Sequence, residues 1–422
     1  MSGLRISRRG FLGAAGLLVA GTALSACGGG GGQAAGAGGG GLLGGPRPLT
    51  IWASQYEVPG LEKVAERFKA DTGVSIRVIQ RNYNGQMLSD FLTQVPTGEG
   101  PDIIVAPHDV LGQVVNNGAV SPVDLIDPEE NFVDIALQAV TYDGRYYGVP
   151  FIIENVALLR NNAMTQHTPT DFDDLLAEGH RLMDEGVAKY PFTTSQSEAS
   201  GDPYHLYPIQ SSFGAEVFER DADGAYTAEL GMGGEEGRAF ADYLAEMGRN
   251  RDLIVTMTPD ISKQAFVDGE SPYFIAGPWN LPDIQAAGMD IEVLSVPSAG
   301  GQPATPFVGV SSFMINANSS SPLAARDLTL NYLSQPEVQL ELFTNNQRPP
   351  ANKEALAGMG DPVLAEYARI AQEDGAPMPS IPQMGAVWNF WGSTENGIVT
   401  GAGDPAQLWD NMITNIERAI DQ

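Results

Sequence analysis

The order of strands and helices near residue 49 constrains the fold of this chain more than any other feature. Residues 49–52 form a short apolar run typical of a buried strand, and apolar residues then recur over 61–68 at the three- and four-residue spacing of a helix. Residues 74–79 and 102–106 predict two further strands. Strands joined by a crossover helix lie parallel in one sheet. The chain therefore begins its folded body as an α/β protein with an open parallel sheet.

Polar side chains follow the predicted strands. Open parallel sheets bind ligands at the carboxyl ends of their strands. After the first strand the chain carries Gln55 and Tyr56, and after the 102–106 strand it carries Asp109. Residues 147–153 form an extended apolar run that ends in Glu154 and Asn155. We expect these polar residues to lie near a ligand site.

The length of the chain predicts two lobes. About 375 residues follow Arg47, which exceeds what one hydrophobic core usually serves. A second α/β region is predicted over 157–305, with a helix near 172–185 and a strand at 273–276. Strand-like sequence returns at residues 307–310, which indicates that the chain passes between the lobes more than once.

The N-terminal segment predicts export and a lipid anchor. Residues 1–26 carry paired arginines, a short apolar run and a Leu-Ser-Ala-Cys sequence that ends at Cys27, which resembles a twin-arginine signal with a bacterial lipobox. The apolar run is shorter than the roughly 20 residues that span a bilayer. Residues 27–46 are nearly all Gly and Ala, and a flexible coil of this length reaches about 23 Å. We expect a protein tethered outside the cell membrane through lipidated Cys27; the alternative is an ordinary cleaved signal with a chance cysteine.

Composition excludes several classes of ligand. The formal net charge is −29, which argues against nucleic acid or anionic lipid as a ligand. The single cysteine excludes a disulfide and a Cys-based metal site, and the four histidines are scattered. We therefore predict no metal and no cofactor.

Several motifs resemble, in order and spacing, those of the maltose/maltodextrin-binding proteins. They are Trp52, residues 68–73, 98–104, His108-Asp109, Gly277-Pro278-Trp279, residues 306–310, 378–384 and Trp388. The resemblance implies a periplasmic-binding-protein type II fold with a hinge and a ligand cleft between two lobes, residues 47–153 with 307–350 and residues 157–305 with 351–422. It also implies a monomeric sugar-binding component that delivers its ligand to the membrane permease subunits of an ABC importer.

The resemblance also assigns ligand-binding residues. It places Asp109 and Glu154 on the first lobe, and Tyr204, Trp279 and Trp388 on the second. Asp202 matches a glutamate of the family, and Met378 falls at a ligand-lining position. The chemistry suits a sugar, because carboxylates accept strong hydrogen bonds from hydroxyls and flat rings pack on the C–H faces.

Each assignment has a structural alternative. Trp279 and Trp388 could be core aromatics, Glu154 could close the crossing strand, and Asp109 could cap a helix that begins at Val110.

The chain also departs from the family pattern. Ala106 stands where the family pattern has a tryptophan, and Val110 and Gly392 stand where it has arginines. Pro259 replaces a tyrosine of the pattern, and His205 replaces a phenylalanine. Gln55, Tyr56, Asn155 and Trp391 are candidates to supply the missing contacts. The leading hypothesis is a lipoprotein that captures an oligosaccharide, maltodextrin or a related α-glucoside, for ATP-driven import. The alternatives are an exported glycoside hydrolase, since paired carboxylates beside aromatics also suit that reaction, and a surface adhesin without a small ligand.

Overall fold

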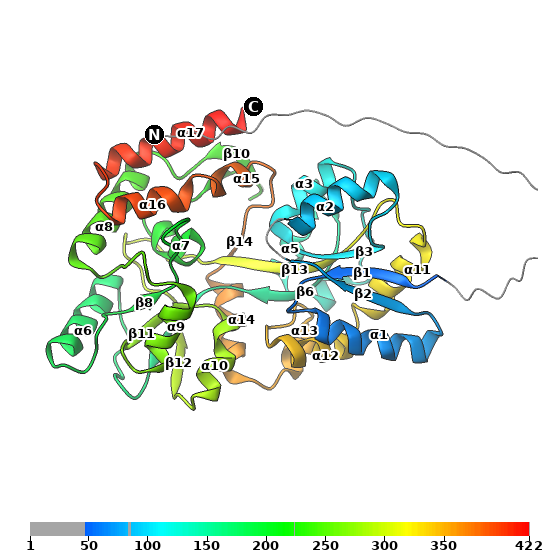
Figure 1. Ribbon diagram of the computed structural model, residues 1–422, viewed down its shortest axis with the longest axis horizontal. Coiled ribbons are helices and arrows are strands. Elements are labelled where there is room, and N and C mark those ends of the chain that lie inside the picture. The colour runs from blue at the N-terminus through cyan, green and yellow to red at the C-terminus, as the bar shows by residue number, and fades with distance from the viewer. Residues whose placement is uncertain (1–46, 83–85, 223, 422) are drawn as a thin grey trace, which may run out of the picture. The chain divides into compact units, whose positions relative to one another are not determined.

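The computed structural model describes residues 47–82, 86–222 and 224–421 (Figure 1). All of them belong to one compact unit, Pro46–Gln422. The predicted export signal, the tether and the lipidation site Cys27 lie outside the described residues. None of the helices in the described part of the chain is long and apolar enough to cross a membrane.

Six strands form the first sheet. β1 pairs in parallel with β2 and β3, as the strand–helix–strand pattern predicts, and β13 then runs antiparallel to both β3 and β6. The short strand β14 continues the sheet in parallel beside the start of β13. The strands are β1 (Leu49–Ala53), β2 (Ile76–Gln80), β3 (Ile103–Pro107), β6 (Val149–Glu154), β13 (Phe307–Ile315) and β14 (Ala376–Pro377).

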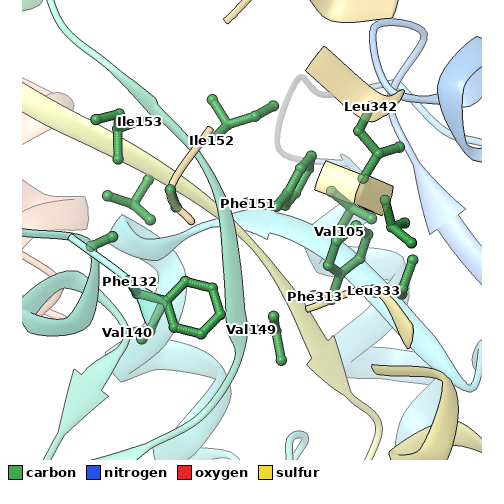
Figure 2. Packing of buried hydrophobic residues seen from close by; sticks show 14 of the residues in the cluster. Val105, Phe132, Val140, Val149, Phe151, Ile152, Ile153, Phe313, Leu333 and Leu342 are labelled. Carbon is green, nitrogen blue, oxygen red and sulfur yellow. The ribbon is translucent and has the colours of Figure 1, made fainter. Parts of the chain in front are cut away.

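Alternate residues of this sheet enter two different cores, as the two-residue period of a strand requires. In β3, Ile103 and Val105 face one apolar cluster, whereas Ile104 and Ala106 face the other. In the first cluster the rings of Phe151 and Phe313 stack 4.3 Å apart (Figure 2). The helices on this sheet are α1 (Val58–Thr72), α2 (Gln86–Gln94), α3 (Leu111–Asn116), α4 (Pro128–Asn131), α5 (Asp134–Ala139), α11 (Pro322–Asp327), α12 (Pro336–Asn346) and α13 (Lys353–Gly358).

Four strands form the second sheet, in the order β12–β7–β11–β8. It is also buried on both faces: Leu158 and Ile275 face one cluster, and Leu159 and Phe274 face the other. The strands are β7 (Ala157–Asn161), β8 (Thr193–Thr194), β11 (Tyr273–Ala276) and β12 (Ile291–Leu294). Helices α8, α16 and α17 pack together against this lobe (Figure 1). The helices here are α6 (Phe172–Asp184), α7 (Pro203–Ser211), α8 (Gly234–Asn250), α9 (Pro259–Val267), α10 (Leu281–Ala286), α15 (Met384–Trp388), α16 (Trp391–Val399) and α17 (Pro405–Ile420).

Two small hairpins complete the strands. They are β4 (Thr141–Tyr142) with β5 (Arg145–Tyr146), and β9 (Phe218–Arg220) with β10 (Tyr226–Leu230).

Three segments of chain join the two sheets. The first leads from β6 to β7, the second enters β13, and the third contains β14. Helix α14 (Pro362–Glu373) lies at the same junction, because Ala368 and Ala371 pack into the first sheet's core while Tyr367 and Ile370 pack into the second sheet's core. The predicted α/β fold with two lobes is confirmed.

The observed elements follow the predicted ones closely, with one instructive shift. The strand predicted at 74–79 begins only at Ile76. Gly73 ends α1 in the left-handed conformation, with φ of 76°, and Val74 donates its N–H to the Thr72 hydroxyl. The turn that caps α1 therefore uses the first two residues of the predicted strand.

Candidate functional site

Glu154 ends β6 at the junction of the two lobes, where it forms an ion pair that the sequence did not predict. Its Oε2 lies 2.7 Å from Nε of Arg348, without an aligned hydrogen bond. Burial raises the pKa of Glu154 above its ordinary value, Arg348 opposes that rise, and the charge of Glu57 adds to it. The Glu154 side chain keeps 28% of its surface exposed, so the carboxylate can still accept hydrogen bonds from a ligand.

Arg348 also links Glu154 to Tyr56. Its guanidinium carbon lies 5.1 Å from the centre of the Tyr56 ring, within the range of a cation–π contact. The arginine follows Gln347, which ends α12 in the left-handed conformation with φ of 52°. No motif pointed to Arg348, because a turn between two helices gives no periodic signal. Sequence reasoning missed it, although the chain does place a cation at the site.

Asp109 lies in the short turn of helix at the end of β3, but it does not cap α3. That helix begins after Val110 without a side-chain cap, so the alternative reading of Asp109 as an N-cap is wrong. Asp109 Oδ1 is buried and has no hydrogen-bond partner among the described residues. Burial raises the pKa of Asp109 to about 6, against the lowering effect of nearby backbone N–H groups. A buried acceptor without a hydrogen-bond partner destabilises the protein. A ligand hydroxyl that donates to it would recover this free energy on binding.

Tyr204 reaches the same junction from the second lobe. It belongs to α7, whose first turn is capped by the side chain of Asp202. The Tyr204 hydroxyl lies 3.5 Å from the Glu154 carbonyl oxygen and 3.4 Å from that of Phe307. Burial raises the pKa of Tyr204 well above its ordinary value, as do the charges of Glu154, Asp202 and Asp109. The charges of three predicted carboxylates therefore act on one phenol.

Asp202 is held in place by His205. His205 Nδ1 lies 2.8 Å from Asp202 Oδ2, and the His205 backbone N–H donates to Asp202 Oδ1. Burial works to raise the pKa of Asp202, but His205 together with Ser195 holds it below its ordinary value. Asp202 is thus kept ionised, as an acceptor for ligand hydroxyls must be.

Trp279 packs beside Tyr204, with the ring centres 6.2 Å apart. The indole folds back over Gly277, where a Cβ would lie only 2.1 Å from a ring carbon. Glycine is required here because any side chain would displace the indole. Trp279 is only half-buried, and it also contacts the His205 ring edge-to-face at 5.8 Å. The position suits a ring that stacks on a sugar.

Trp388 is also half-buried, whereas Trp391 is not available to a ligand. The two indoles stack with centres 5.4 Å apart, and Trp391 is completely buried with its N–H donated to Gln210. The expectation that Trp391 supplies a missing ligand contact is therefore wrong: it supports Trp388 from behind. Asn155 is similarly buried and donates to the carbonyl of Val156, so it also offers a ligand little surface.

Three other predicted residues have mixed placements. Gln55 is exposed beyond β1 and Tyr56 is half-exposed beside Arg348. Met378 is buried, and its carbonyl accepts a hydrogen bond from His108 Nε2 at 2.8 Å. His108 also accepts from the N–H of Val310, so its imidazole ties β3 to two of the segments that join the lobes. Burial lowers the pKa of His108 to about 4, which keeps this link neutral.

The loop before α7 leaves no room for a side chain at Gly392. A Cβ on Gly392 would lie 1.9 Å from the Ser200 carbonyl oxygen, so this loop occupies the space that a side chain would need. Glu395, one turn further along α16, is buried and has no aligned hydrogen-bond partner among the described residues. Burial and the charge of Asp202 raise the pKa of Glu395 well above its ordinary value.

A cavity of about 1040 Å³ begins beside two of these residues, His108 and Met378. It is bordered by the β4–β5 and β9–β10 hairpins, and Met378 is the only predicted site residue in its lining. We place the candidate site at Tyr204 instead, because Glu154, Asp202 and the half-buried ring of Trp279 come together there. No group of three or more His, Cys, Asp or Glu within the described ranges could hold a metal ion.

Comparisons with known proteins identify the relatives of this chain. The family model described as bacterial extracellular solute-binding protein matches residues 63–372. The chain is 23% identical over 376 residues to a galactooligosaccharide-binding protein of Bacillus subtilis, covering 86% of this chain and 87% of the relative. It is 23% identical over 392 residues to a maltooligosaccharide ABC transporter solute-binding lipoprotein of Streptococcus pneumoniae, covering 89% of each.

Solved structures extend the similarity to three dimensions. A cyclo/maltodextrin-binding protein in complex with maltotetraose superposes with a TM-score of 0.76 at 27% identity, covering 89% of this chain and 98% of the other. The resemblance to the maltodextrin-binding proteins that the motifs indicated is thus confirmed. The protein belongs to the family of bacterial extracellular solute-binding proteins.

Proposed function

We propose that this protein captures an oligosaccharide, a maltodextrin or a related α-glucoside, and delivers it to the permease subunits of an ATP-driven importer. The family consists of binding proteins, and relatives over most of the chain length are named for oligosaccharides. A strongly acidic protein can bind a neutral sugar without electrostatic penalty, since its net charge opposes only anionic ligands.

One observation carries the proposal: the surroundings of Tyr204. Its hydroxyl lies close to the Glu154 carbonyl, its ring packs beside Trp279, and the charges of Asp109, Glu154 and Asp202 act on it. Carboxylates would accept hydrogen bonds from sugar hydroxyls, while Trp279 and Trp388 would cover the C–H faces. Met378, Gln55 and Tyr56 would border the ligand.

The binding step would close two lobes around the sugar. We assign residues 47–153 with 307–358 to the first lobe, because Ala351 and α13 pack with its core and helices, and residues 157–305 with 359–422 to the second. The support is that each sheet has its own apolar cores and that few segments join them. A ligand held by both lobes shifts the population toward the closed form by its extra affinity for that form.

The protein would act as a monomer outside the cell, anchored through lipidated Cys27 after export by the twin-arginine route. The support is the signal sequence over residues 1–26, the extracellular character of the family, and the relative that is named a lipoprotein. The Gly- and Ala-rich segment 27–46 would let the binding unit move above the membrane to reach its permease.

We expect no hydrolysis of the captured sugar. Glu154 is engaged by Arg348, and the family is one of binding proteins. Incubation with nitrophenyl α-glucosides and α-maltosides checks this directly, since sustained release of nitrophenol would favour a glycoside hydrolase instead.

Titration calorimetry against a panel of sugars tests the binding proposal. The panel contains maltose, maltotriose, maltotetraose, trehalose, sucrose and galactooligosaccharides. We expect at least one to bind with a micromolar dissociation constant or better, about −8 kcal/mol. The same ligand should raise the melting temperature, because it binds only the folded state. Neither heat nor a thermal shift with any sugar would remove the proposal.

A further inference from the structure

A separate cavity of about 230 Å³ lies beside Asp109, between the end of β3 and helix α2. Apart from Asp109 its lining is apolar: Met87, Leu88, Ile104, Ala106, Pro107 and Val110. Two of these residues, Ala106 and Val110, stand where the family resemblance implies a tryptophan and an arginine. The smaller side chains leave this part of the first lobe hollow.

The cavity adjoins the candidate sugar site through Asp109. The carboxylate lines the cavity, and His108, the residue before it, accepts the backbone N–H of Val310 on β13, whose neighbour Gly309 pairs with Glu154. Asp109 Oδ1 is buried without a partner in the described part of the chain. A ligand group that enters the cavity from the sugar site would therefore pass one strong acceptor.

The polarity of the lining decides what can fill this space. The cavity volume of about 230 Å³ is well above what a single water or hydroxyl requires. An unmodified sugar ring carries hydroxyls around its whole rim, yet among the described residues the lining offers a single acceptor side chain, that of Asp109. The other hydroxyls would be buried without partners, which costs more than leaving them in water. An apolar group would lose nothing there and would displace poorly bound water.

We propose that this cavity is a subsite for an apolar substituent, alkyl or aryl, carried by the captured oligosaccharide next to a hydroxyl that donates to Asp109. The inference rests on the proposed function and names its ligand class more closely. The preferred ligand is then a substituted glycoside rather than a plain maltodextrin.

Titration calorimetry with matched ligands tests the subsite. Maltotriose is compared with 4-nitrophenyl α-maltotrioside, whose apolar group is at the reducing end, and with maltotriose that carries a 4,6-O-benzylidene group at the non-reducing end. We expect one of the two substituted sugars to bind at least about tenfold tighter than maltotriose, the lower range for filling an apolar pocket.

Variants that fill the cavity locate the effect. Leu88→Phe and Val110→Phe should bring the ratio of the two affinities close to one. Leu92→Phe serves as the matched control, because Leu92 lies one turn further along α2 against the same apolar cluster but does not line the cavity. It should keep the full preference. Melting curves identify which variants are folded, and Leu88, only partly buried, is the more tolerant position.

The outcomes separate the two proposals. Maltotriose binding without any advantage for either substituted sugar overturns the subsite and leaves the proposed function intact. The subsite is also overturned if a folded cavity-filling variant still binds the substituted sugar more tightly than maltotriose, or if Leu92→Phe loses this preference. No heat with any of the three ligands, together with no binding in the sugar panel, overturns the proposed function and the subsite with it.

Discussion

Replacing Arg348 by methionine gives the sharpest test of the electrostatics at the site. Methionine is shorter than arginine but keeps an unbranched apolar stem, and it leaves Glu154 without its cation while Glu57 still acts on it. Removing one partner of a fully buried ion pair costs about 3–5 kcal/mol, and an exposed pair is worth about 0–1 kcal/mol. With 11% of Arg348 and 28% of Glu154 exposed, we expect a loss of about 2 kcal/mol in the free energy of unfolding.

The loss should depend on pH in a definite direction. Burial already raises the pKa of Glu154, and removing Arg348 takes away the main effect that opposes this rise. A group whose pKa is raised by folding favours the folded state when protonated, and that contribution is lost as the pH rises through its folded pKa. The defect of Arg348→Met should therefore be largest at pH 7–8 and should shrink toward pH 4.

Urea unfolding at pH 7.5 and pH 4.5 measures the effect, in a cycle with Glu154→Gln and the double variant. At pH 7.5 the double variant should be more stable than Arg348→Met by about 1–2 kcal/mol, because no uncompensated charge remains. Arg238→Met removes an exposed pair with Asp410 and should leave stability unchanged. Equal stability of Arg348→Met and wild type at both pH values would refute the reasoning.

Three further predictions concern the site. Gly277→Ala should weaken sugar binding by roughly tenfold, because the new Cβ displaces Trp279. Calorimetry compares it with Gly385→Ala, whose Cβ would meet no atom within 4 Å and which should bind sugar normally. Sugar affinity should fall as the pH drops below about 6, because Asp109 takes up a proton there and ceases to be an ionised acceptor. Asp109→Asn should bind sugar weakly, and its affinity should lack this fall below pH 6. Glu395→Gln should raise the melting temperature at pH 8 more than at pH 4.5, because the raised pKa of Glu395 makes its ionisation at high pH destabilising. An equal rise in melting temperature at both pH values would contradict this.

Much of the fold could be predicted because its signals are local. The strand at 273–276 matches β11, and the glycine that ends α1 adopts the expected conformation. The returning strand at 307–310 is in fact nine residues long, since β13 pairs at different points with β14, β3 and β6. The spacing of apolar residues within the strand could not predict the length of β13, because its partner strands lie far away along the chain.

The site was predictable only where a motif carried the residue. Trp279 was found through Gly277-Pro278-Trp279, and the structure gives that motif a steric reason. Arg348 was missed because it comes from a turn, and its partner Glu154 lies almost two hundred residues earlier. Trp391 was assigned wrongly because exposure depends on packing with Trp388 and Gln210, which no local pattern reveals.

A crystal structure of the protein with the tightest-binding sugar of the panel tests the central claim most directly. The account predicts a sugar held between the lobes, with a ring stacked on Trp279 and hydroxyls donating to Asp109 and Glu154. A sugar bound wholly within one lobe, or bound without contact to Trp279 and both carboxylates, would contradict it.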